Sequence, residues 1–241
     1  MTTAMRLTTE RLLLLDIDET LVHSRASIPT KTSTVRRRNS TGNNGAYSFI
    51  PGKQCMEATF TLLLEGTRIT VHSQKRPFCD TFLETMGRKF DIGLFTASRR
   101  QYAEVIANWL DAKRNVIQYV FHRDHCIRTN GRMVKDLKAI GCDVKTTIII
   151  DNLPSCFENQ SRNGLPCKSF YGGEVDTELQ KLMELLIEMD TTHGDIRYEL
   201  ARVRKELRSF RKLRQLRAST EELVEAQCLP NVPAALGIFD L

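Results

Sequence analysis

The chain has 241 residues, 41% of them hydrophobic and 27% charged, with a formal net charge of +6 at pH 7. That length suffices for one well-packed α/β domain with extensions. No apolar run approaches the roughly 20 residues that span a bilayer, and the seven cysteines form no C-x-x-C pair. We therefore expect no membrane segment, disulfide framework or zinc ribbon, and a soluble, reducing compartment, nuclear or cytoplasmic.

The first expected strand ends in two acids. Residues 1–10 are polar and are expected to form a frayed tail. Four leucines then predict a buried parallel strand, after which Asp16, Asp18 and Thr20 follow at spacings of two. Ligands of open α/β sheets gather beyond the carboxyl ends of strands, and two carboxylates at this spacing can share a hard divalent cation. A polar loop or a helix cap at Thr20 is the structural alternative.

The next segment is basic and polar. Residues 25–53 contain six basic residues and no acid, with clustered Gly, Asn, Ser and Pro, which predicts a flexible basic loop. A β insert is expected over residues 55–72, where two β-prone runs surround Glu65-Gly66-Thr67. Pro77 is expected at the first position of a helix over residues 78–88. Farther along we expect strands over residues 91–96, 116–121 and 146–150 and helices over residues 99–110 and 175–189.

A second strand also ends in an acid. Residues 146–150 are β-branched almost throughout and lead into Asp151-Asn152. Such a pair is common in turns, so its position after a buried strand is what gives it weight. Strands that alternate with helices indicate βαβ units and a mostly parallel sheet. The fold class expected is therefore α/β, with a catalytic domain over residues 11–190.

Residues 191–241 are expected to form a basic helical extension. Between residues 196 and 217 there are nine basic and two acidic residues. An apolar stripe alternates spacings of four and three until Arg214 interrupts it; its members are Ile196, Leu200, Val203, Leu207 and Phe210. We expect this helix to dock on the catalytic domain; oligomerisation, binding of an acidic or phosphorylated protein, and a merely solvated charged face stay open. Without interleaved aromatics or a known motif, we do not expect nucleic-acid binding.

The motif sequence resembles a known family. Residues 16–23 (DIDETLVH) are similar to the first motif of haloacid-dehalogenase-superfamily phosphotransferases and, more narrowly, of the small RNA polymerase II C-terminal-domain phosphatases, also called NLI-interacting-factor-like phosphatases. Further matches follow in order at residues 75–77, 94–98, 123–126, 135–137, 148–152 and 176–179. The resemblance covers residues 11–188, apart from the divergent stretch 25–53. Ile17 replaces the usual leucine and His122 the usual phenylalanine.

The resemblance implies the fold and the reaction. The fold would be a haloacid-dehalogenase-like, Rossmannoid parallel sheet flanked by helices, with a small β insert and the C-terminal helical extension. Asp16 would be the nucleophile that becomes an aspartyl phosphate, and Asp18 the general acid and later the general base. Thr96 and Lys135 would bind the phosphate.

The resemblance also implies a metal and supporting residues. Mg²⁺, which prefers oxygen ligands, would be held by the Asp16 carboxylate, the Asp18 backbone carbonyl and the Asn152 side chain. Asp151 would hold Asn152 and Lys135 in place. Arg123 either contacts the substrate peptide or forms a structural ion pair. We expect Cys126 in the core and assign structural roles to His23 and His72.

The function implied is that of a magnesium-dependent protein serine/threonine phosphatase. The family acts on phosphoserine in flexible, proline-containing tails such as the RNA polymerase II C-terminal domain, and the β insert would form part of the peptide site. An inactive scaffold of the same fold is the first alternative. A small-metabolite phosphatase is the second, although such enzymes usually carry a larger cap domain, for which this chain has no room between its motifs.

Overall fold

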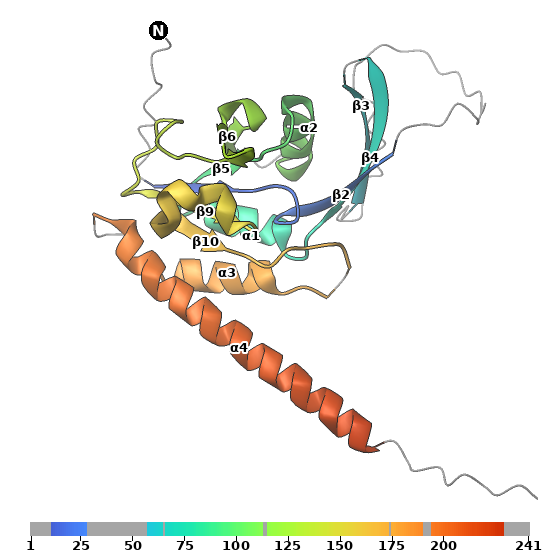
Figure 1. Ribbon diagram of the computed structural model, residues 1–241, viewed down its shortest axis with the longest axis vertical. Coiled ribbons are helices and arrows are strands. Elements are labelled where there is room, and N and C mark those ends of the chain that lie inside the picture. Colours follow the sequence, from blue (N-terminus) through green and yellow to red (C-terminus); the bar gives the residue numbers. More distant parts are fainter. Residues whose placement is uncertain are drawn as a thin grey trace, which may run out of the picture. The chain divides into compact units, whose positions relative to one another are not determined.

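The computed structural model describes residues 11–27, 57–64, 66–112, 115–173, 175–189 and 194–228, with side chains to residue 213. A five-stranded parallel sheet with the strand order β10-β9-β1-β5-β6 forms its centre (Figure 1). Its strands are β1 (Leu12–Leu15), β5 (Asp91–Phe95), β6 (Ile117–Phe121), β9 (Thr147–Asp151) and β10 (Gly164–Pro166). The α/β class with a parallel central sheet is confirmed.

The central strand β1 is buried on both faces. Leu12 and Leu14 pack in a core cluster with Phe95, Ile149 and other apolar residues. Leu13 and Leu15 point to the opposite face, because side chains alternate along a strand, and they too are fully buried. Burial on both faces explains why β1 is an unbroken apolar run rather than an alternating one.

A second, three-stranded antiparallel sheet follows β1, with the order β2-β4-β3. Its strands are β2 (Val22–Ser27), β3 (Glu57–Leu64) and β4 (Thr67–Lys75). The hairpin β3–β4 agrees with the expected insert, but β2 is a correction. Residues 25–27 were assigned to the flexible loop, whereas they pair with residues 70–72 of β4. These residues alone carry no strand pattern, and tertiary pairing decides their conformation. Residues 28–53 of the expected loop lie outside the described residues.

Three helices belong to the same part of the chain: α1 (Cys79–Met86), α2 (Arg100–Leu110) and α3 (Glu178–Ile187). The expected start of α1 at Pro77 is wrong, because Phe78 takes a left-handed conformation with φ 66° just before the helix. Five short elements were not predicted: the edge strand β10 of the central sheet, the hairpin β7 (Ile127–Thr129) with β8 (Arg132–Val134), and the 3-10 helices η1 (Arg123–His125) and η2 (Pro154–Asn163).

The C-terminal helix α4 spans Ile196–Cys228. The chain divides into two compact units, residues 1–203 and 204–241, and the first two turns of α4 belong to the first unit. Within it, Ile196, Leu200 and Val203 are at most 4% exposed, so the start of the expected apolar stripe is packed. In the described part of the chain, no helix has the length and apolarity that a membrane span requires.

Candidate active site

The carboxyl ends of three adjacent strands carry the polar residues expected at the site. Strand β1 lies between β5 and β9, and Leu15 is in register with Leu94 and Ile150. Asp16 directly follows Leu15, Asp151 directly follows Ile150 at the end of β9, and Thr96 is the first residue after β5. All three side chains belong to residues at most 6% exposed. The structure therefore brings together residues that are 135 positions apart in sequence, at the sheet edge where α/β folds bind ligands.

Lys135 joins two of these carboxylates. Its Nζ lies 2.5 Å from Asp16 Oδ1 and 2.6 Å from Asp151 Oδ2, and the lysine is 1% exposed. Burial raises the pKa of Asp16 to about 7, against the opposing effect of Lys135. Burial alone would lower the pKa of Lys135, but the two carboxylates together raise it. Lys135 therefore remains an ammonium. Its charge only partly offsets the effect of burial on the neighbouring Asp16 carboxylate.

The hairpin β7–β8 delivers Lys135 to this position. Asn130 and Gly131 form its turn with φ values of 50° and 77°, the left-handed pair that Asn-Gly favours in two-residue hairpin loops. Lys135 follows β8 directly, and its backbone N–H donates to the Cys156 carbonyl at 2.6 Å. The Asn-Gly pair is the signal from which this hairpin was predictable, although the segment was not assigned as strand.

Asn152 presents its side-chain oxygen on the Thr20 side. Its Nδ2 donates to Ser169 Oγ at 3.0 Å, and its Oδ1 lies 3.4 Å from the Thr20 hydroxyl. Thr20 is held in turn by Arg76, whose Nη1 donates to the Thr20 carbonyl at 3.1 Å. Arg76 is fully buried and also makes a two-pronged ion pair with Asp176 at 2.8 and 2.9 Å. A buried clamp therefore fixes the loop between Asp16 and β2.

The donor set fits Mg²⁺. The expected ligands are a carboxylate, an amide oxygen and a main-chain carbonyl, all of them hard oxygens. Among the described residues, no group of three or more His, Cys, Asp and Glu side chains is arranged to hold a metal. The uncompensated buried carboxylate of Asp16 is the feature that a divalent cation would offset.

Asp18 is held by hydroxyl groups rather than by cations. Tyr102 Oη donates to Asp18 Oδ1 at 2.5 Å, and Ser98 Oγ donates to Asp18 Oδ2 at 2.7 Å. The Thr96 hydroxyl lies 3.3 Å from the same Oδ2. Sequence reasoning missed Ser98 and Tyr102; the tyrosine also belongs to the apolar face of its helix and is 9% exposed.

Arg123 and Cys126 lie near this edge. Arg123 is exposed, and its Nε donates to the Ala97 carbonyl at 2.8 Å, immediately beside Thr96. Cys126 is half-buried and packs against the core cluster, as expected. Burial raises the pKa of its thiol, so this cysteine is a poor nucleophile at neutral pH.

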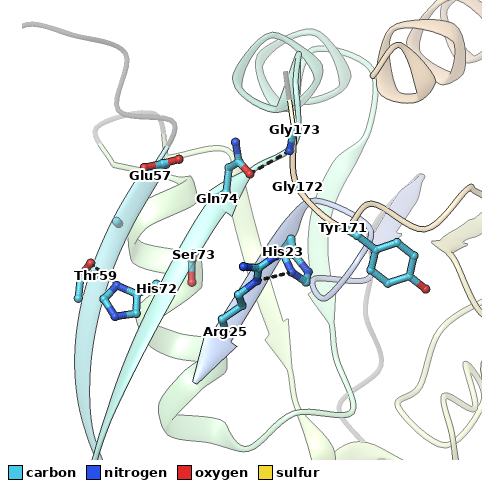
Figure 2. Close-up of a pocket in the computed structure, with 11 residues that line it drawn as sticks. His23, Arg25, Glu57, Thr59, His72, Ser73, Gln74, Tyr171, Gly172 and Gly173 are labelled. Carbon is cyan, nitrogen blue, oxygen red and sulfur yellow. Dashed lines mark hydrogen bonds between the residues drawn. The ribbon is translucent and has the colours of Figure 1, made fainter. Parts of the chain in front are cut away.

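A polar pocket of about 430 Å³ opens over the β2-β4-β3 sheet. Figure 2 shows side chains from all three strands and the segment Tyr171–Gly173 around it. His23 Nε2 accepts a bond from Arg25 Nε at 3.4 Å, and His72 Nδ1 lies 2.9 Å from the Thr59 hydroxyl. Gly173 donates its N–H to Gln74 Oε1 at 3.2 Å. The two histidines therefore line this pocket.

Comparison with curated proteins gives relatives with phosphatase names. A Caenorhabditis elegans protein named CTD small phosphatase-like protein 3 is 34% identical over 84% of this chain and 62% of its own length. A mouse protein named carboxy-terminal domain RNA polymerase II polypeptide A small phosphatase 2 is 33% identical over 79% of this chain and 61% of its own length. A Drosophila melanogaster protein named CTD nuclear envelope phosphatase 1 homolog is 30% identical over 82% of this chain and 74% of its own length.

The chain spans less than two thirds of the length of the worm and mouse relatives. The family model described as NLI interacting factor-like phosphatase matches residues 11–197. That range contains every residue described above at the strand ends, in the hydroxyl-bonded Asp18 group and in the pocket. The chain therefore belongs to the NLI interacting factor-like phosphatase family.

Proposed function

We propose that this chain is a magnesium-dependent protein serine/threonine phosphatase that works through an aspartyl phosphate on Asp16. The observation that carries the proposal is the buried contact of Lys135 with both Asp16 and Asp151, at the sheet edge where Asp18 also lies. One carboxylate in this group is fixed by a cation, and a second is fixed separately by hydroxyls. Those are the environments that a nucleophile and a proton donor require.

The first half-reaction transfers the phosphoryl group to the enzyme. An oxygen of Asp16 attacks phosphorus, the bond between phosphorus and the serine oxygen breaks, and Asp18 gives its proton to that oxygen. Lys135 and Thr96 bind the phosphoryl oxygens and stabilise their developing charge. The products of this step are the free serine side chain and the acyl phosphate on Asp16.

The second half-reaction releases phosphate. Asp18, now ionised, takes a proton from a water molecule whose oxygen attacks phosphorus. The bond between phosphorus and Asp16 breaks, so that Asp16 is again a carboxylate and Asp18 is again protonated. Mg²⁺, held by Asp16, Asn152 and the backbone carbonyl of Asp18, would supply charge neutralisation at the phosphoryl oxygens.

The substrate we propose is phosphoserine in a flexible protein tail, such as the RNA polymerase II C-terminal domain named in the mouse relative. The pocket over the β2-β4-β3 sheet is the proposed place for residues that flank the phosphoserine, and Arg123 a further contact. A nuclear or cytoplasmic location is proposed with this substrate. The inactive-scaffold alternative is disfavoured because Asp16, Asp18, Thr96, Lys135, Asp151 and Asn152 are all present.

The test is turnover of a phosphopeptide array by the full chain. The array holds peptides that carry phosphoserine, phosphothreonine or phosphotyrosine in varied flanking sequences, with small phosphorylated metabolites alongside. We expect phosphate release from phosphoserine and phosphothreonine peptides with Mg²⁺, its loss with EDTA and its return with excess Mg²⁺. Turnover confined to metabolites, or unchanged by EDTA, would contradict the proposal. Asp16→Asn, measured on the same array, controls for contaminating phosphatase.

A further inference from the structure

Asp18 is the end of a chain of hydroxyl groups that begins in the β2-β4-β3 sheet. Ser73 Oγ on β4 lies 2.7 Å from Ser24 Oγ on β2. Ser24 Oγ lies 2.7 Å from Tyr102 Oη on α2. Tyr102 Oη in turn lies 2.5 Å from Asp18 Oδ1. Four consecutive oxygens from four separate segments are therefore within hydrogen-bond distance.

Proton counting gives the chain a direction. A phenol has a single proton, and Tyr102 uses it toward Asp18, whose carboxylate in the ionised form only accepts. The Tyr102 oxygen must then accept from Ser24, and the Ser24 oxygen from Ser73. A tyrosine hydroxyl is protonated at neutral pH and is therefore available as a donor.

Both carboxylate oxygens of Asp18 are held, one on each side. Tyr102 holds Oδ1 and Ser98 holds Oδ2, so the plane of the carboxylate has little freedom to rotate. Ser98 shares its side of Asp18 with Thr96, which is proposed to bind phosphate. Tyr102 approaches from the other oxygen and is 9% exposed, with its hydroxyl satisfied by Asp18 and Ser24.

We propose that Tyr102 is a positioning residue for catalysis, which aims the Asp18 carboxyl group at the leaving oxygen of the substrate. Ser24 and Ser73 anchor the Tyr102 hydroxyl to the β2-β4-β3 sheet. This inference rests on the proposed function, in which Asp18 protonates the leaving group. It adds a residue and a route by which the insert sheet contributes to the chemical step.

The leaving group separates this role from a merely structural one. A serine alkoxide leaves poorly and needs the proton of Asp18, whereas nitrophenolate leaves readily without one. The value of kcat/KM covers only the steps up to departure of the leaving group, so hydrolysis of the phosphoenzyme does not enter it. Misaligned Asp18 therefore lowers kcat/KM for a phosphoserine peptide while p-nitrophenyl phosphate is spared.

The experiment compares kcat/KM for these two substrates in Tyr102→Phe, which keeps the ring and removes the hydroxyl. We expect the value for the phosphoserine peptide to fall by about ten- to a hundredfold, the scale set by misplacing a catalytic group. The value for p-nitrophenyl phosphate should change less than about threefold. Tyr119→Phe is the matched control, because Tyr119 stacks on Phe121 and lies outside the site; both substrates should be unaffected.

The role of Ser24 in anchoring the Tyr102 hydroxyl is tested with two substitutions in β2. Ser24→Ala should lower kcat/KM for the phosphoserine peptide, as Tyr102→Phe does. The decrease should be smaller, because Tyr102 keeps its hydrogen bond to Asp18. Ser27→Ala is the control, since Ser27 is an exposed residue of β2. If Tyr102→Phe does not fold, the ratio of peptide to aryl rates in Ser24→Ala decides the question.

Equal losses on both substrates, or no loss on either, would overturn the positioning role of Tyr102. Asp18→Asn in the same assay separates the two levels of the argument. If Asp18→Asn loses activity chiefly on the peptide but Tyr102→Phe does not, this inference fails and the proposed function stands. If Asp18→Asn itself shows no dependence on the leaving group, the general-acid assignment is the part that fails.

Discussion

The two carboxylates of the first motif lie two residues apart, yet their surroundings differ in kind. Asp16 is 6% exposed and forms an ionic cluster with Lys135 and Asp151, which are each 1% exposed. Asp18 is half-buried and contacts the neutral hydroxyls of Tyr102, Ser98 and Thr96. Strand alternation does not separate them, because residues two apart on a strand would share a face. The tight turn after Asp16 does: the N–H groups of residues 20, 21 and 22 all point to the Ile17 carbonyl.

The difference matches two different tasks. A nucleophile must stay ionised and fixed in position. A buried ion pair fixes it, but the stability of the site then depends strongly on each partner of the pair. A general acid must hold and release a proton, and hydroxyls can both donate and accept, so they remain partners to either form. We therefore expect substitutions in the ionic cluster to damage stability and activity together. Substitutions in the hydroxyl group should damage activity with little loss of stability.

Asp16→Asn should give the largest effect. It removes the proposed nucleophile but keeps a side chain of nearly equal shape, and Lys135 keeps its contact with Asp151. We expect phosphopeptide turnover to fall by roughly 10⁴-fold or more, as for loss of other catalytic nucleophiles, and the far-UV circular dichroism spectrum to stay unchanged. Turnover within a few-fold of the unsubstituted protein would contradict the assignment of Asp16 as the nucleophile and Asp18 as the general acid.

Lys135→Met breaks the ionic cluster from the other side. It leaves two buried carboxylates facing each other without a cation, which should lower the free energy of unfolding by about 3–5 kcal/mol. Activity should fall by about 10²–10³-fold because a charge-stabilising group is lost. Urea unfolding and phosphopeptide kinetics measure the two effects. Lys138→Met, three residues along at an exposed position, is the control and should change neither; equal stability of both variants would refute the ionic account.

Shortening α4 tests a region that carries none of the catalytic motifs. Removal of residues 196–241 takes away Ile196, Leu200 and Val203, which are buried in the first unit, at about 1.5–3 kcal/mol of lost burial for each side chain. Removal of residues 204–241 keeps them and should be milder in a thermal melt. Both shortened proteins, where folded, should retain turnover of p-nitrophenyl phosphate. Loss of that turnover in a folded protein would show that α4 completes the site.

Cysteine alkylation should have the smallest effect. Burial raises the pKa values of Cys156 to about 11 and of Cys142 and Cys167 to about 12, and it also raises that of Cys126. At neutral pH these thiols are protonated, and their reactive thiolate fraction grows only as pH approaches those values. Iodoacetamide at pH 7 should therefore leave phosphopeptide turnover unchanged. Rapid inactivation, prevented by bound phosphate, would point to a cysteine in the chemistry.

The ionic half of the site was predictable from the sequence, whereas two of the hydroxyl partners of Asp18, Ser98 and Tyr102, were not. Asp16 and Asp151 each follow an apolar run, and parallel strands place their carboxyl ends on one edge. Lys135 came from the motif resemblance, since a lysine alone carries no positional signal. The ring of Tyr102 fits the apolar periodicity of its helix. That pattern gives no sign of the contact between its hydroxyl and Asp18.

The long sheet and its helices were likewise predictable, and the short elements were not. Strands β1, β5 and β9 have enough β-branched or aliphatic residues to be recognised singly. Strand β2 has the sequence VHSRAS, which lacks an apolar alternation and becomes a strand through pairing with β4. The left-handed Phe78 also delays α1, so that Pro77 precedes the helix instead of taking its first position.

The most direct test of the account is to trap the phosphoenzyme. The full chain is mixed with a phosphoserine peptide labelled with ³²P, quenched in acid within milliseconds and digested. We predict transient label on the peptide that contains Asp16, stable in acid, released by hydroxylamine as an acyl phosphate is, and absent in Asp16→Asn. Rapid turnover with no labelled protein, or acid-stable label on a residue other than Asp16, would contradict the proposed covalent mechanism.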